Sequence, residues 1–333
     1  MRKYLDANII FETKDKDKKS WLEARKCGIG GSDAASVLGL NPYRSSMSVY
    51  LEKTNDNNII NNFGKEFINQ SSLPKNDSNV VDKETNYKME LGNKLENFVA
   101  NEFTLKTGKK VRNVNGILRN DKYPFAISNI DRSVVGEKAF LECKVTSSYN
   151  KKLWEKEVPI HYQIQCYHYM AVSGATHCYV AALIGNEKLI IHELKRDEEI
   201  IKEIMDLEKK FWEQCVLGGE LPLPDGSSDY SKVLQSFYKD SKQEELILFE
   251  KEDVLNRYDD VCGLIKDLDS EKKTIEQYIQ MQMKEYEIAY LGERKITWKK
   301  QTRTSIDTTR LKKQHPEIVK EFMKTTTTRV FRI

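Results

Sequence analysis

The chain has 333 residues, 39% of them hydrophobic and 10% aromatic, which is enough apolar material for a sizeable core and argues against wholesale disorder. Its 54 basic and 51 acidic residues leave a formal net charge of only +3. Bulk charge therefore does not identify a nucleic-acid-binding protein, and any such site must be a local patch. No apolar run reaches the roughly 18 residues of a membrane span, and the N-terminus lacks the apolar stretch of a secretory signal. We expect a soluble, cytoplasmic protein with no membrane partner.

Cysteines and histidines give no sign of a zinc or iron–sulfur site. The six cysteines include no CxxC pair, which a zinc ribbon needs, and nothing in their spacing brings four thiolates together. The five histidines form no HxH or HExxH pattern. The simplest interpretation is six reduced thiols in a reducing compartment.

The first part of the chain predicts two helices separated by a polar insert. Ser32 and Asp33 can cap the first helix. Residues 54–88 are rich in Asn, Ser, Lys and Asp, which indicates a loop. Apolar residues at helical spacing predict the second helix over 89–107, and Gly108 ends it.

The middle of the chain alternates between strand and helix patterns. Short apolar runs with period-two alternation are typical of strands, and longer runs with period 3.6 are typical of helices. The predicted strands cover 111–120, 124–130, 139–145, 177–185 and 188–194, and the predicted helices cover 160–173 and 197–216. This order predicts an α/β fold with a central mixed sheet flanked by helices. Residues 218–232, rich in proline and glycine, indicate a linker.

Residues 241–290 carry a coiled-coil-like stripe. Seven apolar residues follow alternating steps of three and four, and Lys272 occupies the one missing position. Gly263 and Asp269-Ser270 are places where the stretch can break into a hairpin. The stripe either packs on its own core or forms a self-association surface. We therefore expect three parts, a core over 1–235, a helical hairpin or coiled-coil-like segment over 236–290, and a basic C-terminal segment over 291–333.

Three charged residues on neighbouring predicted strands form a candidate metal site. Asp131 follows an apolar strand, and the ten residues before Glu142 are enough for the chain to return as a hairpin. Glu142 and Lys144 stand two apart on a strand, so their side chains point to the same face. Carboxylate oxygens suit Mg²⁺ or Mn²⁺, with the backbone carbonyl of Cys143 as a further ligand. The metal would lower the pKa of a bound water, while Lys144 orients that water or stabilises developing charge.

A plainer interpretation of the same residues is a solvated strand face with a Glu–Lys pair. Such pairs are common by chance in a chain that is 32% charged, although the apolar residues that alternate with this pair favour a buried strand. Glu96 can add a third carboxylate from the preceding helix, where Gly92 allows a close approach to the sheet. Glu90 and Glu102 on the same helix compete for that role.

Several motifs, in order along nearly the whole chain, resemble one protein family. They are RKCGIGGSDAASVLGLNPYRS from Arg25, LGNKLE over 91–96, NIDR over 129–132, LECK over 141–144, HYQIQCYHYMAVSG over 161–174 and ITWKKQTRTSIDTTRLKKQHPEI in the tail. These motifs resemble those of YqaJ-type viral recombinases, lambda-exonuclease-like members of the PD-(D/E)XK nuclease superfamily. The resemblance implies a PD-(D/E)XK core with a helical C-terminal insertion. It also implies an exonuclease that digests one strand of linear double-stranded DNA from its 5′ end and leaves 3′ single-stranded tails.

The resemblance further assigns catalytic roles. Asp131 and Glu142 match metal ligands, Glu96 matches the glutamate of the preceding helix, and Lys144 matches the catalytic lysine. Gln163 resembles a glutamine near the active site, with Gln165 as the alternative in register.

A second set of residues would hold the DNA. Arg25 and Ser32 match the pair that grips the 5′-phosphate, which suits a guanidinium fork beside a hydroxyl. Asn129 stands where some relatives have a serine, and its amide can still donate to a phosphate. Further candidates for holding or stacking on DNA are Arg44, Arg132, Trp154 and Trp298.

The implied cofactor is Mg²⁺, with Mn²⁺ as an alternative. The implied partners are double-stranded DNA ends, a single-strand annealing protein and further copies of the chain, commonly as a trimer, in the cytoplasm of a bacterial host cell. Two other functions stay open. One is a PD-(D/E)XK endonuclease, which would not need the Arg25–Ser32 pair because it needs no free 5′ end. The other is a non-catalytic DNA-binding protein on the same fold, which would not need to keep Glu96, Asp131, Glu142 and Lys144 together.

Overall fold

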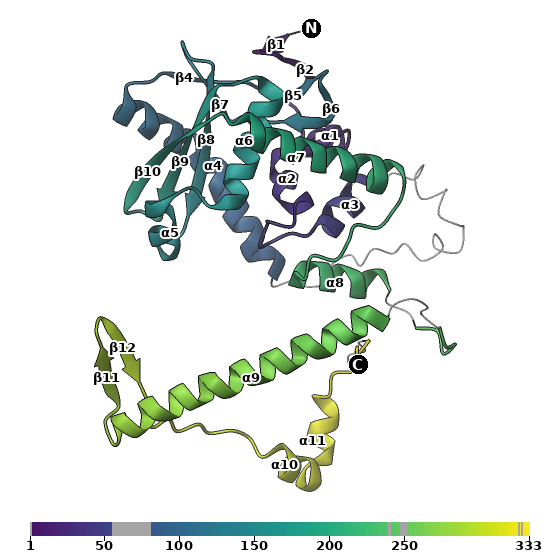
Figure 1. Ribbon diagram of the computed structural model, residues 1–333, viewed down its shortest axis with the longest axis vertical. Coiled ribbons are helices and arrows are strands. Elements are labelled where there is room, and N and C mark those ends of the chain that lie inside the picture. Colours follow the sequence, from purple (N-terminus) through teal and green to yellow (C-terminus); the bar gives the residue numbers. More distant parts are fainter. Residues whose placement is uncertain (1, 55–80, 239–240, 247–251, 326, 328) are drawn as a thin grey trace. The chain divides into compact units, whose positions relative to one another are not determined.

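The computed structural model describes residues 2–54, 81–238, 241–246, 252–325, 327 and 329–333. The chain divides into two units, one that ends at Tyr238 and one that begins at Lys239 (Figure 1).

The first unit contains two five-stranded sheets. One sheet has the order β1-β2-β5-β6-β3, with β1 (Lys3–Tyr4), β2 (Ala7–Glu12), β3 (Ile29–Gly30), β5 (Gly116–Asn120) and β6 (Tyr123–Ser128). The other has the order β10-β9-β8-β7-β4, with β4 (Val111–Asn113), β7 (Arg132–Val134), β8 (Ala139–Thr146), β9 (His177–Ile184) and β10 (Lys188–Lys195). In each sheet one strand pair is parallel, β3 with β6 and β8 with β9, and the other pairs are antiparallel. The sheets are therefore mixed, as the sequence predicts.

Helices surround these sheets. They are α1 (Lys18–Arg25), α2 (Gly31–Val37), α3 (Ser46–Thr54), α4 (Val81–Thr107), η3 (Ser148–Asn150), α5 (Lys151–Lys156), α6 (Ile160–Ser173), α7 (Glu198–Lys210), η4 (Phe211–Leu217) and α8 (Ser228–Phe237). The predicted α/β class, with a mixed sheet flanked by helices, is confirmed.

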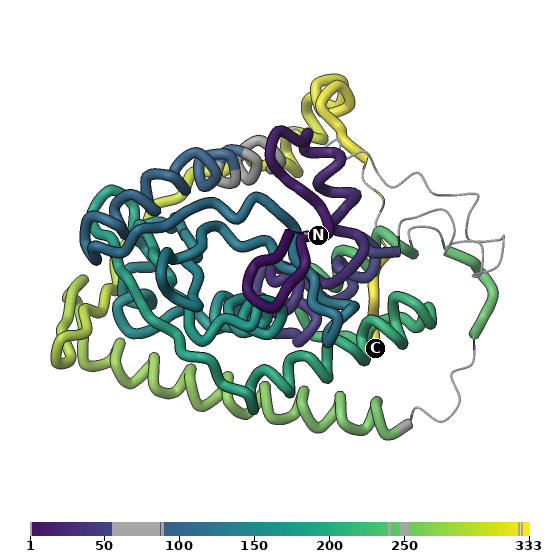
Figure 2. The backbone as a smooth tube through the Cα atoms, turned by 90° about the horizontal axis from the view of Figure 1, so that it is seen from above, coloured from purple at the N-terminus to yellow at the C-terminus, as the bar shows by residue number. Residues whose placement is uncertain are grey.

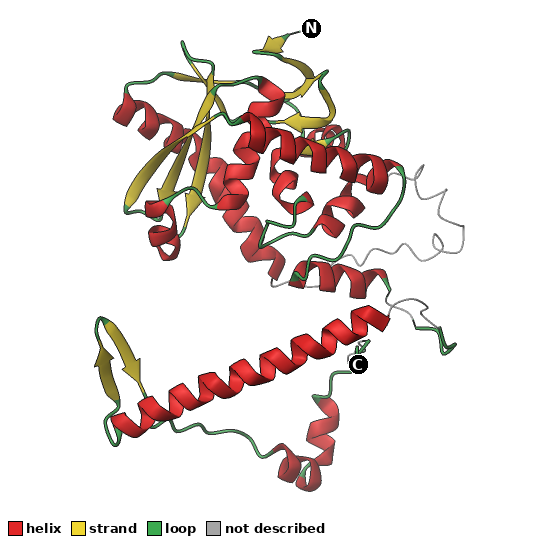
Figure 3. Ribbon diagram, in the orientation of Figure 1, coloured by secondary structure: helices red, strands yellow, loops and turns green. Residues whose placement is uncertain are grey.

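The β8-containing sheet lies between α4 and α6 (Figure 3). Side chains alternate along a strand, so Phe140 and Cys178 pack in the cluster that includes α6. Leu141 and Tyr179 pack in the cluster that includes α4, which runs as one continuous helix (blue in Figure 2). The alternation of β8 thus directs its even-numbered residues toward α6.

Two predicted boundaries near α2 and α4 need correction. Gly30, not Ser32 or Asp33, is the N-cap of α2, and Asp33 in its first turn accepts the Gly30 N–H at 3.0 Å. Helix α4 begins at Val81, so the last part of the predicted loop over 54–88 is helical, because residues 81–88 contain neither glycine nor proline. Residues 55–80 of that loop lie outside the described residues.

The predicted linker over 218–232 belongs to the first unit. Its end is the start of α8, where the Asp229 carboxylate accepts hydrogen bonds from the Ser45 and Ser48 hydroxyls at 2.7 Å each. The buried Tyr230 hydroxyl donates to the Pro222 carbonyl at 2.8 Å. These contacts hold a proline- and glycine-rich stretch against the core, so this stretch is part of the first unit and not a free linker.

The second unit contains α9 (Glu252–Met283), a hairpin of β11 (Ile288–Leu291) and β12 (Arg294–Thr297), α10 (Thr308–Gln314) and α11 (Pro316–Glu321). Of the two alternatives for the helical segment, the hairpin is not observed, because α9 runs unbroken through Gly263 and Asp269-Ser270. One glycine costs a helix only about 1 kcal/mol. Across the described part of both units, no helix has the length and apolar character needed to cross a membrane.

Candidate functional site

Asp131 and Glu142 meet where β7 pairs with β8. The antiparallel register places Arg132 opposite Leu141, so Asp131 lies opposite Glu142. The Asp131 Oδ2 accepts the Cys143 N–H at 2.8 Å, which fixes this carboxylate against β8. The structure therefore brings together the two carboxylates that the spacing predicts.

Lys144 and Gln165 complete this group from β8 and α6. The Lys144 Nζ donates to the Glu142 Oε1 at 2.7 Å and to the Gln165 Oε1 at 3.1 Å. The Gln165 Nε2 donates to the same Glu142 oxygen at 2.7 Å. One amide thus bridges the carboxylate and the ammonium and fixes their relative orientation.

Gln163 does not reach this group. Its Nε2 donates to the Val158 carbonyl at 2.6 Å. Two residues along a helix turn by about 200°, so Gln163 and Gln165 leave α6 on different faces. Of the two glutamines that the sequence leaves as alternatives, the structure places Gln165 at the candidate site and corrects the choice of Gln163.

The carboxylate pair is strongly perturbed. Burial, followed by the charges of Glu142 and Glu96, raises the pKa of Asp131 well above its usual value. Burial lowers the pKa of Lys144, but the charges of Glu142 and Asp131 outweigh it, so this pKa ends above its usual value. Two carboxylates and one ammonium in a buried site leave net negative charge, which favours a bound cation.

The residues present fit a hard divalent cation. Glu142 is only 3% exposed, and its Oε2 has no hydrogen-bond partner among the residues that the structure describes. An unpaired buried carboxylate oxygen is costly, and a cation would satisfy it. The donors at this point are oxygen atoms, which Mg²⁺ and Mn²⁺ prefer.

Glu96 is held apart from this pair. Its Oε1 accepts a hydrogen bond from the Arg132 guanidinium, which also donates to the Asn97 Oδ1 at 2.6 Å. Among the described residues, no group of three or more His, Cys, Asp or Glu side chains converges on one metal position. Glu96 and Asp131 line one pocket, so Glu96 adds negative charge beside the pair without joining it.

The predicted phosphate-binding residues line a pocket together with the carboxylate pair. This pocket includes Arg25, Ser32, Asn129, Asp131 and Glu142. The Arg25 Nη2 donates to the Ser32 Oγ at 2.8 Å. The close approach depends on glycine, since a Cβ at position 31 would lie 2.3 Å from the Tyr169 ring.

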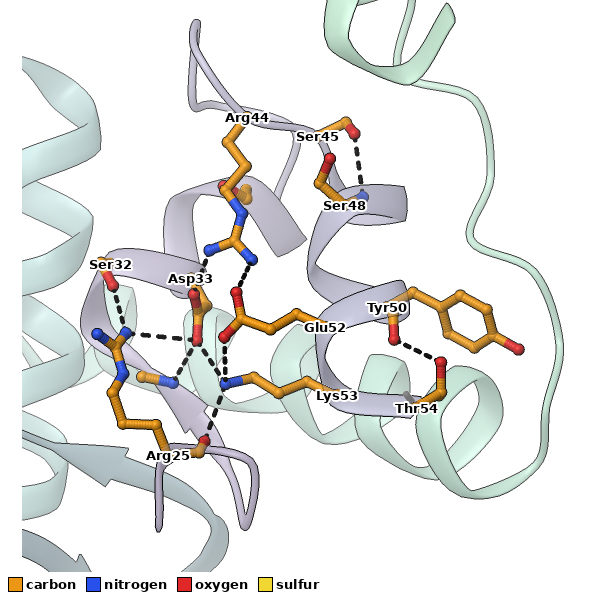
Figure 4. A network of polar contacts seen from close by, with 12 residues as sticks. Arg25, Ser32, Asp33, Arg44, Ser45, Ser48, Tyr50, Glu52, Lys53 and Thr54 are labelled. Atoms are coloured by element: carbon orange, nitrogen blue, oxygen red, sulfur yellow. Dashed lines mark hydrogen bonds and ion pairs between the residues drawn. The ribbon is translucent and has the colours of Figure 1, made fainter. Parts of the chain in front are cut away.

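Asp33 lies beside Arg25 and Ser32 at the centre of an ion-pair network (Figure 4). Its fully buried carboxylate pairs with the Lys53 Nζ at 2.9 Å and the Arg44 Nη1 at 2.7 Å. Burial raises the pKa of Asp33, but the charges of Lys53, Arg25 and Arg44 outweigh it and hold the pKa well below its usual value. Lys53 also donates to the Arg25 carbonyl at 3.0 Å. The network fixes the backbone and side chain of Arg25.

The sequence interpretation misses this network. It treats Asp33 as a helix cap and assigns no role to Lys53, because residues twenty apart carry no local signal of an ion pair. Arg44, which is predicted to hold DNA, instead forms ion pairs with Asp33 and with the Glu52 Oε2 at 2.5 Å.

Two further DNA contacts are wrong and one stays a prediction. Arg132 is 7% exposed and occupied by Glu96 and Asn97, and Trp154 is 1% exposed, so neither is available to DNA. Trp298 is exposed in the second unit, where its backbone N–H donates to the Glu287 carbonyl at 2.9 Å.

Comparison with known proteins identifies the family. The model of the YqaJ-like viral recombinase domain matches residues 20–176. The protein named Uncharacterized protein YqaJ from Bacillus subtilis (strain 168) is 36% identical over 332 residues, which cover 98% of this chain and 97% of that protein. The chain belongs to the YqaJ-like viral recombinase family. The YqaJ match contains every candidate site residue of the first unit described above.

Two solved exonuclease structures show a more distant similarity. The alkaline exonuclease LHK-Exo from Laribacter hongkongensis covers 65% of this chain and 97% of its own, with 16% identity and a TM-score of 0.42. A phage-related exonuclease from Haemophilus somnus 129PT covers 60% of this chain and 100% of its own, with 13% identity and a TM-score of 0.37. Membership of the YqaJ family rests on the sequence matches and not on these two structures.

Proposed function

We propose that this chain is a metal-dependent exonuclease of phage-type recombination. It digests one strand of linear double-stranded DNA from the 5′ end and leaves a 3′ single-stranded tail. The observation that carries this proposal is the single pocket lined by both the Arg25–Ser32 pair and the Asp131–Glu142 pair. A terminal phosphate bound by the first pair would lie near the second, so the bond to be cut is chosen by its place in the strand and not by base sequence.

Asp131 and Glu142 would hold Mg²⁺, or Mn²⁺ as an alternative, with the Cys143 carbonyl as a further ligand. The unpaired buried Oε2 of Glu142 supports this assignment. When bound, the cation supplies a more acidic water and neutralises charge that develops on the phosphate. Glu96 would reinforce the negative potential that attracts the cation.

The chain's own residues would do the remaining chemistry. Lys144 places an ammonium beside the scissile phosphate and stabilises developing negative charge. Gln165 holds that ammonium against Glu142. Arg25 and Ser32 bind the terminal phosphate through charge-assisted hydrogen bonds, and Asn129, which lines the same pocket, contributes an amide donor.

The proposal includes partners. The 3′ tails would pass to a single-strand annealing protein in the cytoplasm of a bacterial host cell. The apolar stripe of α9, which includes Val261, Ile265 and Leu268, lies exposed, which supports a homo-oligomer. Family resemblance favours a trimer.

The Lys144→Ala substitution tests the proposed active site. We expect cleavage of linear duplex DNA in Mg²⁺ to fall by at least about 100-fold, while circular dichroism shows that the variant is still folded at the assay temperature. Lys202→Ala, which removes an exposed lysine of α7, should keep full activity. Full activity of the Lys144→Ala protein would contradict the proposal.

A further inference from the structure

Tyr43 is an exposed aromatic ring on a firmly held backbone. Its side chain is 73% exposed in the connection between α2 and α3. Its backbone N–H donates to the Asn41 Oδ1 at 2.9 Å, and the next residue, Arg44, pairs with Asp33 at 2.7 Å (Figure 4). Contacts on both sides thus fix this short loop, and the ring extends into solvent from a rigid base.

A row of rings connects Tyr43 to Lys144. The Tyr43 ring meets His161 edge-on, with centroids 5.8 Å apart and an interplanar angle of 85°. His161 in turn packs on Tyr162 with a centroid distance of 4.1 Å. The Lys144 Nζ lies 4.6 Å from the centroid of the Tyr162 ring. The exposed ring is therefore the outer end of a packed series whose inner end touches the candidate active site.

The same loop also reaches the phosphate pair. Arg44 binds the Asp33 carboxylate at 2.7 Å, and the other oxygen of that carboxylate lies 3.9 Å from the Arg25 guanidinium. Tyr43 is thus joined to Lys144 by ring contacts and to Arg25 by an ion-pair network. The ring is therefore connected, through neighbouring side chains, to both residues that the proposed function places at the strand end.

We propose that Tyr43, supported by His161, is a stacking platform for the nucleobase of the nucleotide at the 5′ end. This inference rests on the proposed function. The exposed face of an aromatic ring matches the flat face of any base, so stacking holds the nucleotide without selecting a sequence. Stacking also compensates for the stacking that the end base loses when it leaves the duplex.

The test measures the affinity of the full chain for duplex ends in EDTA, where the DNA is not cut. Fluorescence anisotropy compares a 5′-phosphorylated end that carries a normal terminal nucleotide with one whose terminal nucleotide is abasic. A third duplex without the 5′-phosphate reports the phosphate contact. The variants are Tyr43→Ala, Tyr43→Phe, which keeps the ring, and Tyr149→Ala, which removes a tyrosine that is 95% exposed on η3.

We expect removal of the base to weaken binding by the wild type about 5-fold or more. Tyr43→Ala should bind the normal end as weakly as the wild type binds the abasic end. Its affinity should not fall further when the terminal nucleotide is abasic. Tyr43→Phe and Tyr149→Ala should behave as the wild type.

Two results would contradict different claims. If base removal weakens Tyr43→Ala as much as the wild type while both still prefer the phosphorylated end, the stacking platform is wrong and the proposed function stands. If the wild type shows no preference for the phosphorylated end, the end-binding function itself is wrong, and the platform with it.

Discussion

At the scale of single residues, Gln165 links the candidate catalytic groups of β8. Its amide is 6% exposed and bonds both Glu142 and Lys144. Without it, the lysine ammonium and the carboxylate lose a shared positioning partner. We expect Gln165→Ala to lower the rate of cleavage with bound DNA by about 100-fold, because small displacements of positioned groups cost rates of that order.

Gln163 offers a matched control on the same helix. Its amide bonds the Val158 carbonyl, away from the site. Single-turnover digestion of linear DNA should show Gln163→Ala within a few-fold of the wild type. Equal loss in both variants would mean that neither glutamine has the specific contact that the structure gives to Gln165.

Asp33 is expected to stabilise the fold through charge. Asp33→Asn keeps the side-chain volume but leaves the fully buried Lys53 without its closest carboxylate. Removal of one partner of a buried ion pair costs about 3–5 kcal/mol of the free energy of unfolding. Glu52→Gln removes a partly exposed carboxylate that pairs with Arg44 and Lys53. This substitution should lower the free energy of unfolding by less than about 1 kcal/mol. Chemical denaturation at neutral pH compares the two.

The contribution of Asp33 should depend on pH in a defined direction. Its folded pKa is lowered from an unfolded value of about 3.9, so its stabilisation is present above pH about 4. That stabilisation is lost as the pH falls through the folded pKa. The difference in unfolding free energy between the wild type and Asp33→Asn should stay constant from pH 7 to 5 and narrow below pH 4. A difference that widens in acid would contradict this account.

Only part of the candidate site is predictable from the sequence. Asp131, Glu142 and Lys144 are found because strand alternation and a hairpin return suffice to place them together. The bond between Glu96 and Arg132, the choice of Gln165, and the pairing of Asp33 with Lys53 depend on how helices pack on sheets. Spacing along the chain does not encode that packing.

At the scale of elements, α9 carries the expected oligomer contact. Its apolar stripe is exposed, with Leu268 near the centre. Leu268→Asp would bury an unpaired carboxylate in any contact made by the stripe, which is strongly unfavourable. We expect this variant to dissociate the assembly and raise its dissociation constant by at least about 100-fold.

Ser270→Asp is the control for this prediction, because two residues along a helix leave it on a different face from Leu268. Light scattering across a dilution series should give the wild-type mass for Ser270→Asp and a smaller mass for Leu268→Asp. Identical masses for the two variants would mean that the stripe is not the contact.

Elements differ in how well the sequence predicts them. Strands β8, β9 and β10 and helix α6 lie where the sequence predicts them, whereas the strand predicted over 111–120 is divided into β4 and β5, which belong to different sheets. Helix α8 is missed because it is held by contacts that have no local sequence signal. Asp229 accepts a hydrogen bond from the distant Ser45, and the Tyr230 hydroxyl donates to the Pro222 carbonyl. Helix α9 is continuous because single unfavourable residues cost less than the rest of a 32-residue helix provides.

At the scale of the whole molecule, the first unit joins two mixed sheets with helices into one body. The α/β class follows from the order of elements. The sequence predicts a core over 1–235, and in the structure the first unit ends at Tyr238, because the contacts of α8 join the proline- and glycine-rich stretch before it to this unit. Both the carboxylate pair and the phosphate-binding pair belong to this first unit.

The central claim is that these two pairs act together on one DNA end. The most direct measurement is digestion in Mg²⁺ of linear duplex DNA that is labelled at either end of one strand, with and without a 5′-phosphate. A closed circular duplex is the control substrate, and the Arg25→Ala variant is compared with the wild type. We predict stepwise loss from the 5′ end, faster with the phosphate, absent on the circle, and no longer dependent on phosphate in Arg25→Ala. Cutting of the circle would instead indicate an endonuclease. DNA binding without cleavage in either Mg²⁺ or Mn²⁺ would contradict the proposal that the chain is a nuclease.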